Sequence, residues 1–357
     1  MSRRSFPPPS PSPDPNPRGP RGSTLSRYGR PLLIAAVMLI VAATAVAFVA
    51  IRNRSPELAA APTVAVPDAT TVAASQANEA PAARALVPEA VGQPLQVYPA
   101  GALHVVGQER FAVGLVDPES GPIETGTVDL LFFKLVETKG TLTETLPAPF
   151  LPYGVREAHA EDHDDGADEI TGIYVARPRF DAPGNWGVVA RVTMLDGSMR
   201  AGQRAFAVEA ENLLPGPGDA AIPSKTLIAK GPEEIAAICT ADPVDNMHAL
   251  SLDDALKNGK PTVVLFATPA LCASRTCGPS LEAAQELQRR YGTDANFIHV
   301  EIYPGADSER PAAAVAEWDL PSEPWLFLID TEGKVVERFE GGIGLTELDP
   351  AVWALVR

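Results

Sequence analysis

The sequence predicts a multidomain protein with a single N-terminal transmembrane helix, an antiparallel β-sandwich and a C-terminal α/β domain. Three observations support this fold class. Residues 31–51 form an uncharged, almost entirely apolar run. Residues 96–212 contain short apolar segments with a period of two, which is typical of half-buried strands. After residue 235, strand patterns alternate with helix patterns, as they do in α/β sheets.

The composition restricts the possible partners. The chain has 357 residues, with 29 Lys and Arg against 45 Asp and Glu, and a formal net charge of −16. Because nucleic-acid binding needs a basic face to offset phosphates, we expect no nucleic-acid partner. Three cysteines are too few for a scaffold held together by disulfides.

The N-terminal part predicts a membrane anchor. Residues 1–30 are rich in Pro and Arg and read as a disordered cytoplasmic tail. About 20 apolar residues cross a hydrocarbon core of ~30 Å, so residues 31–51 are long enough to span the cell membrane. Arginines collect before this run, which places the N-terminus in the cytoplasm and the C-terminal domains outside it. A signal peptide cleaved near residues 59–61 is the alternative to this single-pass signal anchor.

Two linkers frame the first extracytoplasmic domain. Residues 52–95 are an Ala/Pro-rich linker, and residues 213–234 form a second linker. Between them, residues 96–212 predict the β-sandwich, with a hairpin turn at Asp196-Gly197. The segment from Phe180 to Val188 resembles the late hairpin of small immunoglobulin-like sandwiches found in bacterial envelope proteins.

Residues 235–357 predict strand, helix, strand, helix, strand, strand and helix in that order. A short helix near residue 252 precedes them, with Ser251 as its N-cap. The clearest strands are expected at residues 263–267, 297–302, 325–329 and 335–339, and the clearest helices at residues 281–291 and 347–356.

Cys272 and Cys277 lie between the first strand of this domain and the helix that follows it. A helix N-terminus offers free N–H groups and a positive dipole end, so a thiolate there is stabilised and its pKa falls. Pro279 suits the first helical turn, and Arg275 adds to the effect if its side chain points inward. These features predict a reactive thiol pair, for which we expect no cofactor and no bound metal.

Two motifs carry a resemblance to the thioredoxin-like superfamily, closest to membrane-anchored proteins of the bacterial envelope. They are residues 266–280, which contain both cysteines, and residues 318–327, in which Pro324 falls on the cis-proline position. The resemblance covers residues 235–357. It implies thiol–disulfide exchange on the thiols and disulfides of envelope proteins, with Pro324 shaping the edge where a substrate docks.

The chain departs from that pattern in three places. The spacing is C-x4-C, so either Cys272 or Cys277 matches the attacking cysteine. Leu271 replaces the usual tryptophan before the first cysteine. Leu265 stands where relatives carry a buried acid, so another group must transfer the proton.

Other interpretations stay open. The cysteine pair is alternatively a structural disulfide in a non-catalytic interaction protein. It is otherwise a Cu(I) site in a copper-delivery module, with Met247 and His248 as the best additional ligands. A buried neutral imidazole is expected for His299, and a buried inert thiol for Cys239.

Overall fold

The computed structural model describes residues 85–136, 139–153, 171–211, 214–272, 274–305, 308 and 310–357. All of them fall in one compact unit, Pro67–Arg357. The predicted tail, the apolar run 31–51 and most of the linker 52–95 lie outside these residues. In the part of the chain that is described, no helix is long and apolar enough to cross a membrane.

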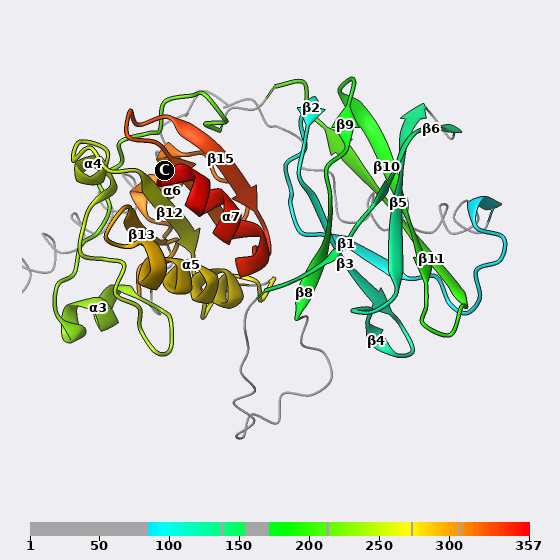
Figure 1. Ribbon diagram of the computed structural model, residues 1–357, viewed down its shortest axis with the longest axis horizontal. Helices are drawn as coiled ribbons and strands as arrows, with labels where there is room; N and C mark the ends of the chain where they lie inside the picture. Colours follow the sequence, from blue (N-terminus) through cyan, green and yellow to red (C-terminus); the bar gives the residue numbers. More distant parts are fainter. Residues whose placement is uncertain are drawn as a thin grey trace, which may run out of the picture. The chain divides into compact units, whose positions relative to one another are not determined.

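The first domain consists of antiparallel sheets that bury a common core (Figure 1). One sheet has the order β1-β3-β8-β7, with β4 paired to β3, and the other has the order β11-β10-β5-β6. Their strands are β1 (Gln96–Pro99), β3 (Phe111–Asp117), β4 (Gly121–Pro122), β5 (Thr127–Val136), β6 (Lys139–Pro147), β7 (Phe150–Pro152), β8 (Gly172–Ala176), β10 (Gly184–Thr193) and β11 (Met199–Val208). A small third sheet pairs β2 (Gly107–Gln108) with β9 (Arg179–Phe180).

The aromatic residues of the period-two segments fill this core. Phe111, Phe132, Phe180 and Trp186 are each no more than 1% exposed, and their rings pack edge to face. Such contacts add to the free energy gained by removing these large side chains from water. The alternation read from the sequence therefore identifies the strands that face the core.

The Asp196-Gly197 hairpin forms as predicted. It joins β10 to β11, with Thr193 paired to Met199 at the closed end. Gly197 has a φ of +81°, which a residue with a side chain rarely adopts. Asp196 accepts a hydrogen bond from the backbone N–H of Ser198 at 2.8 Å, as Asp commonly does in turns.

The C-terminal domain is a four-stranded sheet with helices on both faces (Figure 1). The strand order is β13-β12-β14-β15, in which only the β12–β13 pair is parallel. From β12 onward the elements are β12 (Thr262–Ala267), α5 (Cys277–Tyr291), β13 (Asn296–Glu301), α6 (Ala313–Glu317), β14 (Trp325–Ile329), β15 (Val335–Glu340) and α7 (Leu345–Leu355). This is the order of strands and helices that the sequence predicts.

Alternating residues of β12 define the two faces of this sheet. Leu265 and its neighbours two residues away pack against α5 and α7 in one core. Phe266 packs in a second core with α6 and α4 (Leu252–Ala255). Because every residue of β12 is buried, the strand is covered on both faces, as expected for a central α/β strand.

Two local predictions need correction. Helix α5 begins at Cys277 and not at Leu281, so the second cysteine belongs to the first turn. Ser251 occupies the N-cap position of α4, but its side chain caps no N–H of that helix within the described chain. Its Oγ instead accepts a hydrogen bond from the N–H of Thr226 at 3.0 Å and donates one to Asp253 at 2.6 Å.

Candidate functional site: the cysteine pair

The cysteine pair, Cys272 and Cys277, forms a disulfide between the end of β12 and the start of α5. The two Cα atoms lie 6.1 Å apart, within the normal range for a disulfide. Cys239 is the free cysteine of the chain and is buried. The sequence prediction that Cys272 and Cys277 act together is therefore consistent with the structure.

The two sulfur-bearing residues differ in their access to solvent. Cys277 is 0% exposed, whereas Cys272 is 9% exposed and follows Leu271, which is 46% exposed. Cys277 is also the first residue of α5. Within the described chain, the side chain of its N-cap residue, Thr276, caps no backbone N–H. The unpaired N–H groups of a helix start, together with the helix dipole, favour negative charge on Cys277.

Hydroxyl groups lie beside the more accessible sulfur. The Oγ of Ser274 is 3.2 Å from the Sγ of Cys272 and 2.8 Å from the Oγ1 of Thr276. Such hydroxyls can donate to a thiolate when the disulfide opens.

Glu323 brings a carboxyl group to the disulfide. One of its oxygens and the sulfurs of Cys272 and Cys277 all lie within 4.8 Å of one another. Its Oε2 is buried and has no hydrogen-bond partner among the described residues. Burial raises the pKa of Glu323, and the negative charge of Glu301 raises that pKa further.

The sequence analysis did not identify Glu323, although it showed that a group other than Leu265 must transfer the proton. Leu265, at the position of the relatives' buried acid, is 1% exposed and packs in the core. The carboxyl group arrives instead from the segment just before β14, next to Pro324. The signal available in the sequence was an acidic residue directly before the proline expected to face the thiols.

The other two predicted site residues occupy the surrounding loops. The Glu323–Pro324 peptide bond is cis, as expected for the matching position of the resemblance. Arg275 has a φ of +57°, and its backbone N–H donates to the carbonyl of Cys272 at 3.1 Å. Its side chain is exposed, so its effect on the thiolate stays a prediction.

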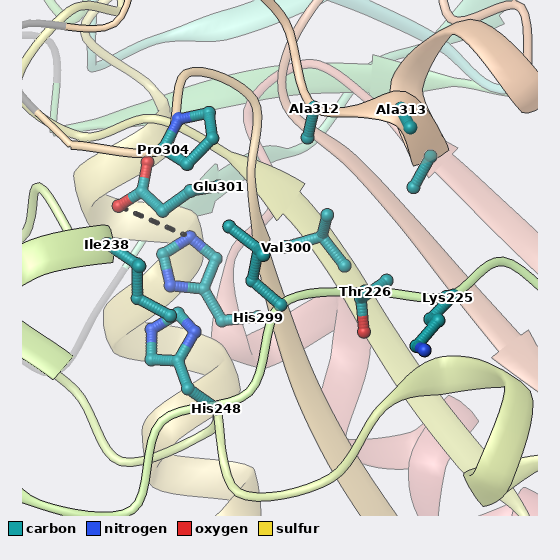
Figure 2. Close-up of a pocket in the computed structure, with 12 residues that line it drawn as sticks. Lys225, Thr226, Ile238, His248, His299, Val300, Glu301, Pro304, Ala312 and Ala313 are labelled. Carbon is teal, nitrogen blue, oxygen red and sulfur yellow. Dashed lines mark ion pairs between the residues drawn. The ribbon is translucent and has the colours of Figure 1, made fainter. Parts of the chain in front are cut away.

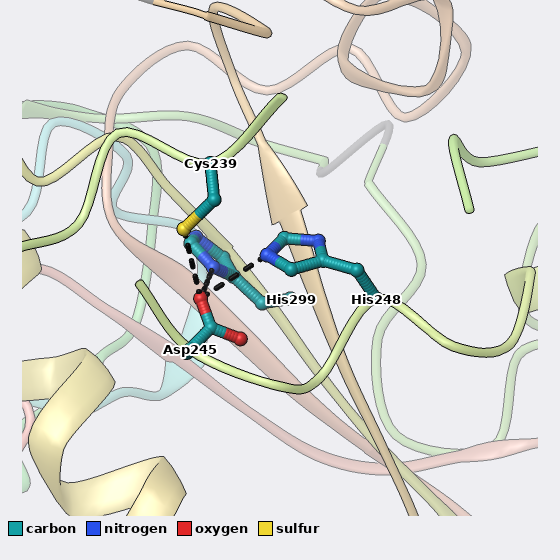
Figure 3. A group of neighbouring side chains, drawn as sticks. All are labelled: Cys239, Asp245, His248 and His299. Atoms are coloured by element: carbon teal, nitrogen blue, oxygen red, sulfur yellow. Dashed lines mark hydrogen bonds and ion pairs between the residues drawn. The ribbon is translucent and has the colours of Figure 1, made fainter. Parts of the chain in front are cut away.

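A second sulfur-containing group lies in the same domain. We call Cys239, Asp245, His248 and His299 the Cys239 cluster; all four side chains are buried (Figure 3). His299 was expected to be neutral. Burial is the largest single effect and lowers its pKa. The hydrogen bonds to Asp245 and Cys239 and the charges of Asp245 and Glu301 together outweigh burial and raise the pKa of His299 to about 10.

The Cys239 cluster also bears on the copper interpretation of the cysteine pair. His248, a ligand expected for that site, is hydrogen-bonded to Asp245 at 3.1 Å. Among the described residues, the possible metal-ligand group that includes Cys272 and Cys277 adds Glu323 and no histidine. That group therefore lacks a histidine, whereas Met247, the other ligand expected for copper, is buried in the same core as Cys272 and Cys277.

Among the comparisons with known proteins, only the comparison with solved structures found similarities. No family model matches the chain, and no curated protein matches it. A thiol:disulfide interchange protein of the thioredoxin family from Chlorobium tepidum is 18% identical over 38% of this chain and 99% of its own, with a TM-score of 0.25. CopC from Methylosinus trichosporium OB3b is 16% identical over 33% of this chain and 99% of its own, with a TM-score of 0.19. The PmoD soluble domain from Methylocystis sp. ATCC 49242 (Rockwell) is 14% identical over 30% of this chain and 76% of its own, also with a TM-score of 0.19.

At these identities and scores, the likenesses carry no conclusion about activity. The domain's own features are more specific. A strand leads to a cysteine pair at the start of a helix, a cis-proline precedes the third strand, and the elements follow in the order strand, helix, strand, helix, strand, strand, helix. The C-terminal domain of this chain therefore has a thioredoxin-like fold.

Proposed function

We propose that this protein catalyses thiol–disulfide exchange through Cys272 and Cys277. One observation carries the proposal: a disulfide at the start of a helix has the half-buried Glu323 beside it, and one carboxyl oxygen of Glu323 is buried without a partner among the described residues. A disulfide that only staples the chain needs no neighbouring proton carrier. Buried polar atoms without partners are uncommon, and a functional role is one explanation for them.

The different exposures of the two sulfurs support different roles for them. A substrate thiolate attacks the Sγ of Cys272, which is the more accessible sulfur. A bond forms between the substrate sulfur and Cys272, the Cys272–Cys277 bond breaks, and its electron pair passes to Cys277. Cys277 leaves as a thiolate, which the start of α5 stabilises.

Glu323 completes the proton balance. Its protonated carboxyl group donates a proton to the Cys277 thiolate, and the resulting carboxylate is the base for the reverse step. A second substrate thiol then passes its proton to the Glu323 carboxylate, attacks the substrate sulfur of the mixed disulfide and releases Cys272 as a thiolate. Cys272 takes up from water the proton that the first substrate thiol lost. The substrate dithiol has become a disulfide, and the protein has gained two electrons and two protons. Run backwards, the same steps reduce a substrate disulfide, and the reduction potentials of the two partners decide the direction.

A trapping experiment tests the assignment of roles. Cys277→Ser leaves Cys272 as a free thiol without its partner, so this variant should accumulate a mixed disulfide with an oxidised substrate peptide, whose other sulfur leaves as a thiol. Cys272→Ser should trap far less, because Cys277 is fully buried. The two variants are matched controls for each other, since each removes one sulfur and keeps one. Equal turnover of insulin disulfides by both variants and the unaltered protein would contradict the proposal.

A structural disulfide is the second candidate, favoured by the burial of both sulfurs. The reduction potential separates the two functions. Exchange catalysts have potentials of about −120 to −270 mV, whereas structural disulfides lie below about −300 mV. Titration of the full chain in glutathione buffers, followed by thiol alkylation and mass spectrometry, gives this value. A pair that stays oxidised below about −300 mV would make the protein a binding module.

We also propose the setting of this activity. The apolar run 31–51 anchors the chain in the cell membrane, the N-terminus is cytoplasmic, and envelope proteins supply the substrate thiols and disulfides. The first domain is an immunoglobulin-like sandwich that acts as a spacer or partner-docking module. Protease added to spheroplasts should digest a C-terminal tag and spare an N-terminal tag. The opposite pattern would overturn this topology.

A further inference from the structure

The Cys239 cluster is assembled from three segments of the C-terminal domain. Cys239 directly follows α3 (Pro232–Ile238), Asp245 and His248 lie in the loop before α4, and His299 is on β13. The four residues are between 1% and 5% exposed. One possible ligand atom of each lies within 4.8 Å of the corresponding atoms of the others. Figure 3 shows the four side chains pointing toward one another.

Three of these side chains converge on a single oxygen, the Oδ2 of Asp245. The Nδ1 of His299 lies 2.7 Å from it, the Nε2 of His248 lies 3.1 Å from it, and the Sγ of Cys239 lies 3.2 Å from it. Here the polar atoms are gathered around one small volume.

The far atoms of two ligands are held by the backbone. The other oxygen of Asp245, Oδ1, accepts a hydrogen bond from the N–H of Met247 at 2.8 Å. The Nε2 of His299 lies 3.2 Å from the carbonyl oxygen of Ala267 and donates to it. Metal-binding histidines usually donate their second ring N–H in this way, which fixes the ring and leaves the other nitrogen free to bind.

We propose that Cys239, Asp245, His248 and His299 form a closed binding site for a divalent transition-metal ion, of which Zn²⁺ is the best match. Two imidazoles, one thiolate and one carboxylate are the donor types that Zn²⁺ takes in four-coordinate protein sites. Mg²⁺ and Ca²⁺ require mainly oxygen ligands, and this cluster offers one side-chain carboxylate. Binding replaces the protons that the four groups share, so the ion enters as protons leave.

The spacing of the four groups suits this ion after a small adjustment. Zn–N and Zn–O bonds of about 2.0–2.1 Å and Zn–S bonds of about 2.3 Å place tetrahedral ligand atoms about 3.3–3.6 Å apart. The contacts to Asp245 are 2.7–3.2 Å. These three distances therefore need to lengthen by less than about 1 Å, and the remaining ligand atoms already lie within 4.8 Å of one another.

A cavity gives an ion access to the cluster. It has a volume of about 220 Å³, and its lining includes His248, His299 and Glu301 (Figure 2). Lys225 lies on its wall as well. The ion would enter past these side chains and then be enclosed. Because all four ligands come from the protein, the site is structural and ties the loop before α4 to β13.

Cobalt spectroscopy on the full chain tests the proposal. Purified protein stripped with a chelator should bind one equivalent of Co²⁺. The complex should show a thiolate-to-cobalt charge-transfer band and the visible bands of tetrahedral Co²⁺, and one equivalent of Zn²⁺ should remove both. Cys239→Ser should lose the charge-transfer band. The double variant Cys272→Ser, Cys277→Ser removes the other two sulfurs and should keep it.

Two results would overturn the proposal. One is the absence of stoichiometric Co²⁺ binding by the unaltered protein. The other is a charge-transfer band that survives in Cys239→Ser and disappears in the double variant, which would place the metal on the cysteine pair. A third measurement uses no variant, so it does not depend on whether a variant folds. Zn²⁺ added to the stripped, unaltered protein should raise its Tm. The outcome is independent of the exchange proposal, which rests on different cysteines.

Discussion

The cysteine pair and the Cys239 cluster share one hydrophobic core on the same face of one sheet, but their polar surroundings differ. At the cysteine pair, the carboxyl group of Glu323 leaves an oxygen unpartnered among the described residues. In the Cys239 cluster, both oxygens of Asp245 have partners. A saturated polar group fixes structure, whereas an unsatisfied one can exchange a proton without breaking other bonds. This difference is the one expected from our two proposals, which assign chemistry to the first site and a structural role to the second.

Removing the charge of Asp245 should have the largest effect on stability, because this carboxylate is the hydrogen-bond partner of the other three residues of the Cys239 cluster. Asp245→Asn keeps the size of the side chain but leaves His248, His299 and Cys239 around a neutral group. Breaking a buried ion pair typically costs about 3–5 kcal/mol, and we expect a loss of free energy of unfolding in that range. Urea unfolding measures it. The control is Asp254→Asn on the exposed side of α4, which should change the free energy by less than about 0.5 kcal/mol.

Removing the proton carrier of the cysteine pair should slow the exchange reaction. Glu323→Gln keeps the shape of the side chain and cannot exchange the proton. Positioned acids and bases contribute about 10²–10⁴-fold, so we expect exchange to slow by about 100-fold. Stopped-flow measurement of mixed-disulfide formation and resolution gives the rate. Glu317→Gln, an exposed change on α6, is the matched control. An unchanged rate and pH profile in Glu323→Gln would assign proton transfer elsewhere.

The same variant should also become more stable at neutral pH. The pKa of Glu323 is raised in the folded protein, so between the unfolded and folded pKa values the folded state binds more protons. Stability from this group is therefore present at low pH and is lost as pH rises through the folded pKa. Unfolding curves between pH 4 and pH 8 should show that the free energy of unfolding of Glu323→Gln rises relative to that of the unaltered protein as pH increases. A constant difference across this range would contradict the raised pKa.

The smallest effect is expected for Arg275. Its side chain is exposed, and exposed charges are screened by salt over about 10 Å at 0.1 M ionic strength. Arg275→Ala should raise the pKa of the reduced thiols slightly at low salt and leave it unchanged at high salt, whereas Arg275→Lys should match the unaltered protein. Alkylation rates measured against pH report this pKa. A large shift that persists at high salt would mean that the side chain turns inward in the reduced protein.

The sequence predicted the parts of the C-terminal domain that depend on local patterns. Strand β12, the order of elements after it and the position of the cysteine pair follow from apolar runs and turn residues. The two clusters were harder, because their members meet only in three dimensions. His299 joins the Cys239 cluster because the parallel register places it beside Leu265 on β12. Glu323 reaches the disulfide from a segment about fifty residues further along the chain, and no local spacing shows that distance.

Glu301 lies between the two clusters, and its position has a thermodynamic consequence. Its Oε1 is 4.0 Å from the Nε2 of His299, and its charge also raises the pKa of Glu323 beside the disulfide. The charge of Glu301 therefore acts on one member of each cluster. Coupling of this kind is reciprocal. If an ion bound in the Cys239 cluster shifts the dithiol–disulfide equilibrium by a given factor, reduction of the disulfide changes the affinity for that ion by the same factor.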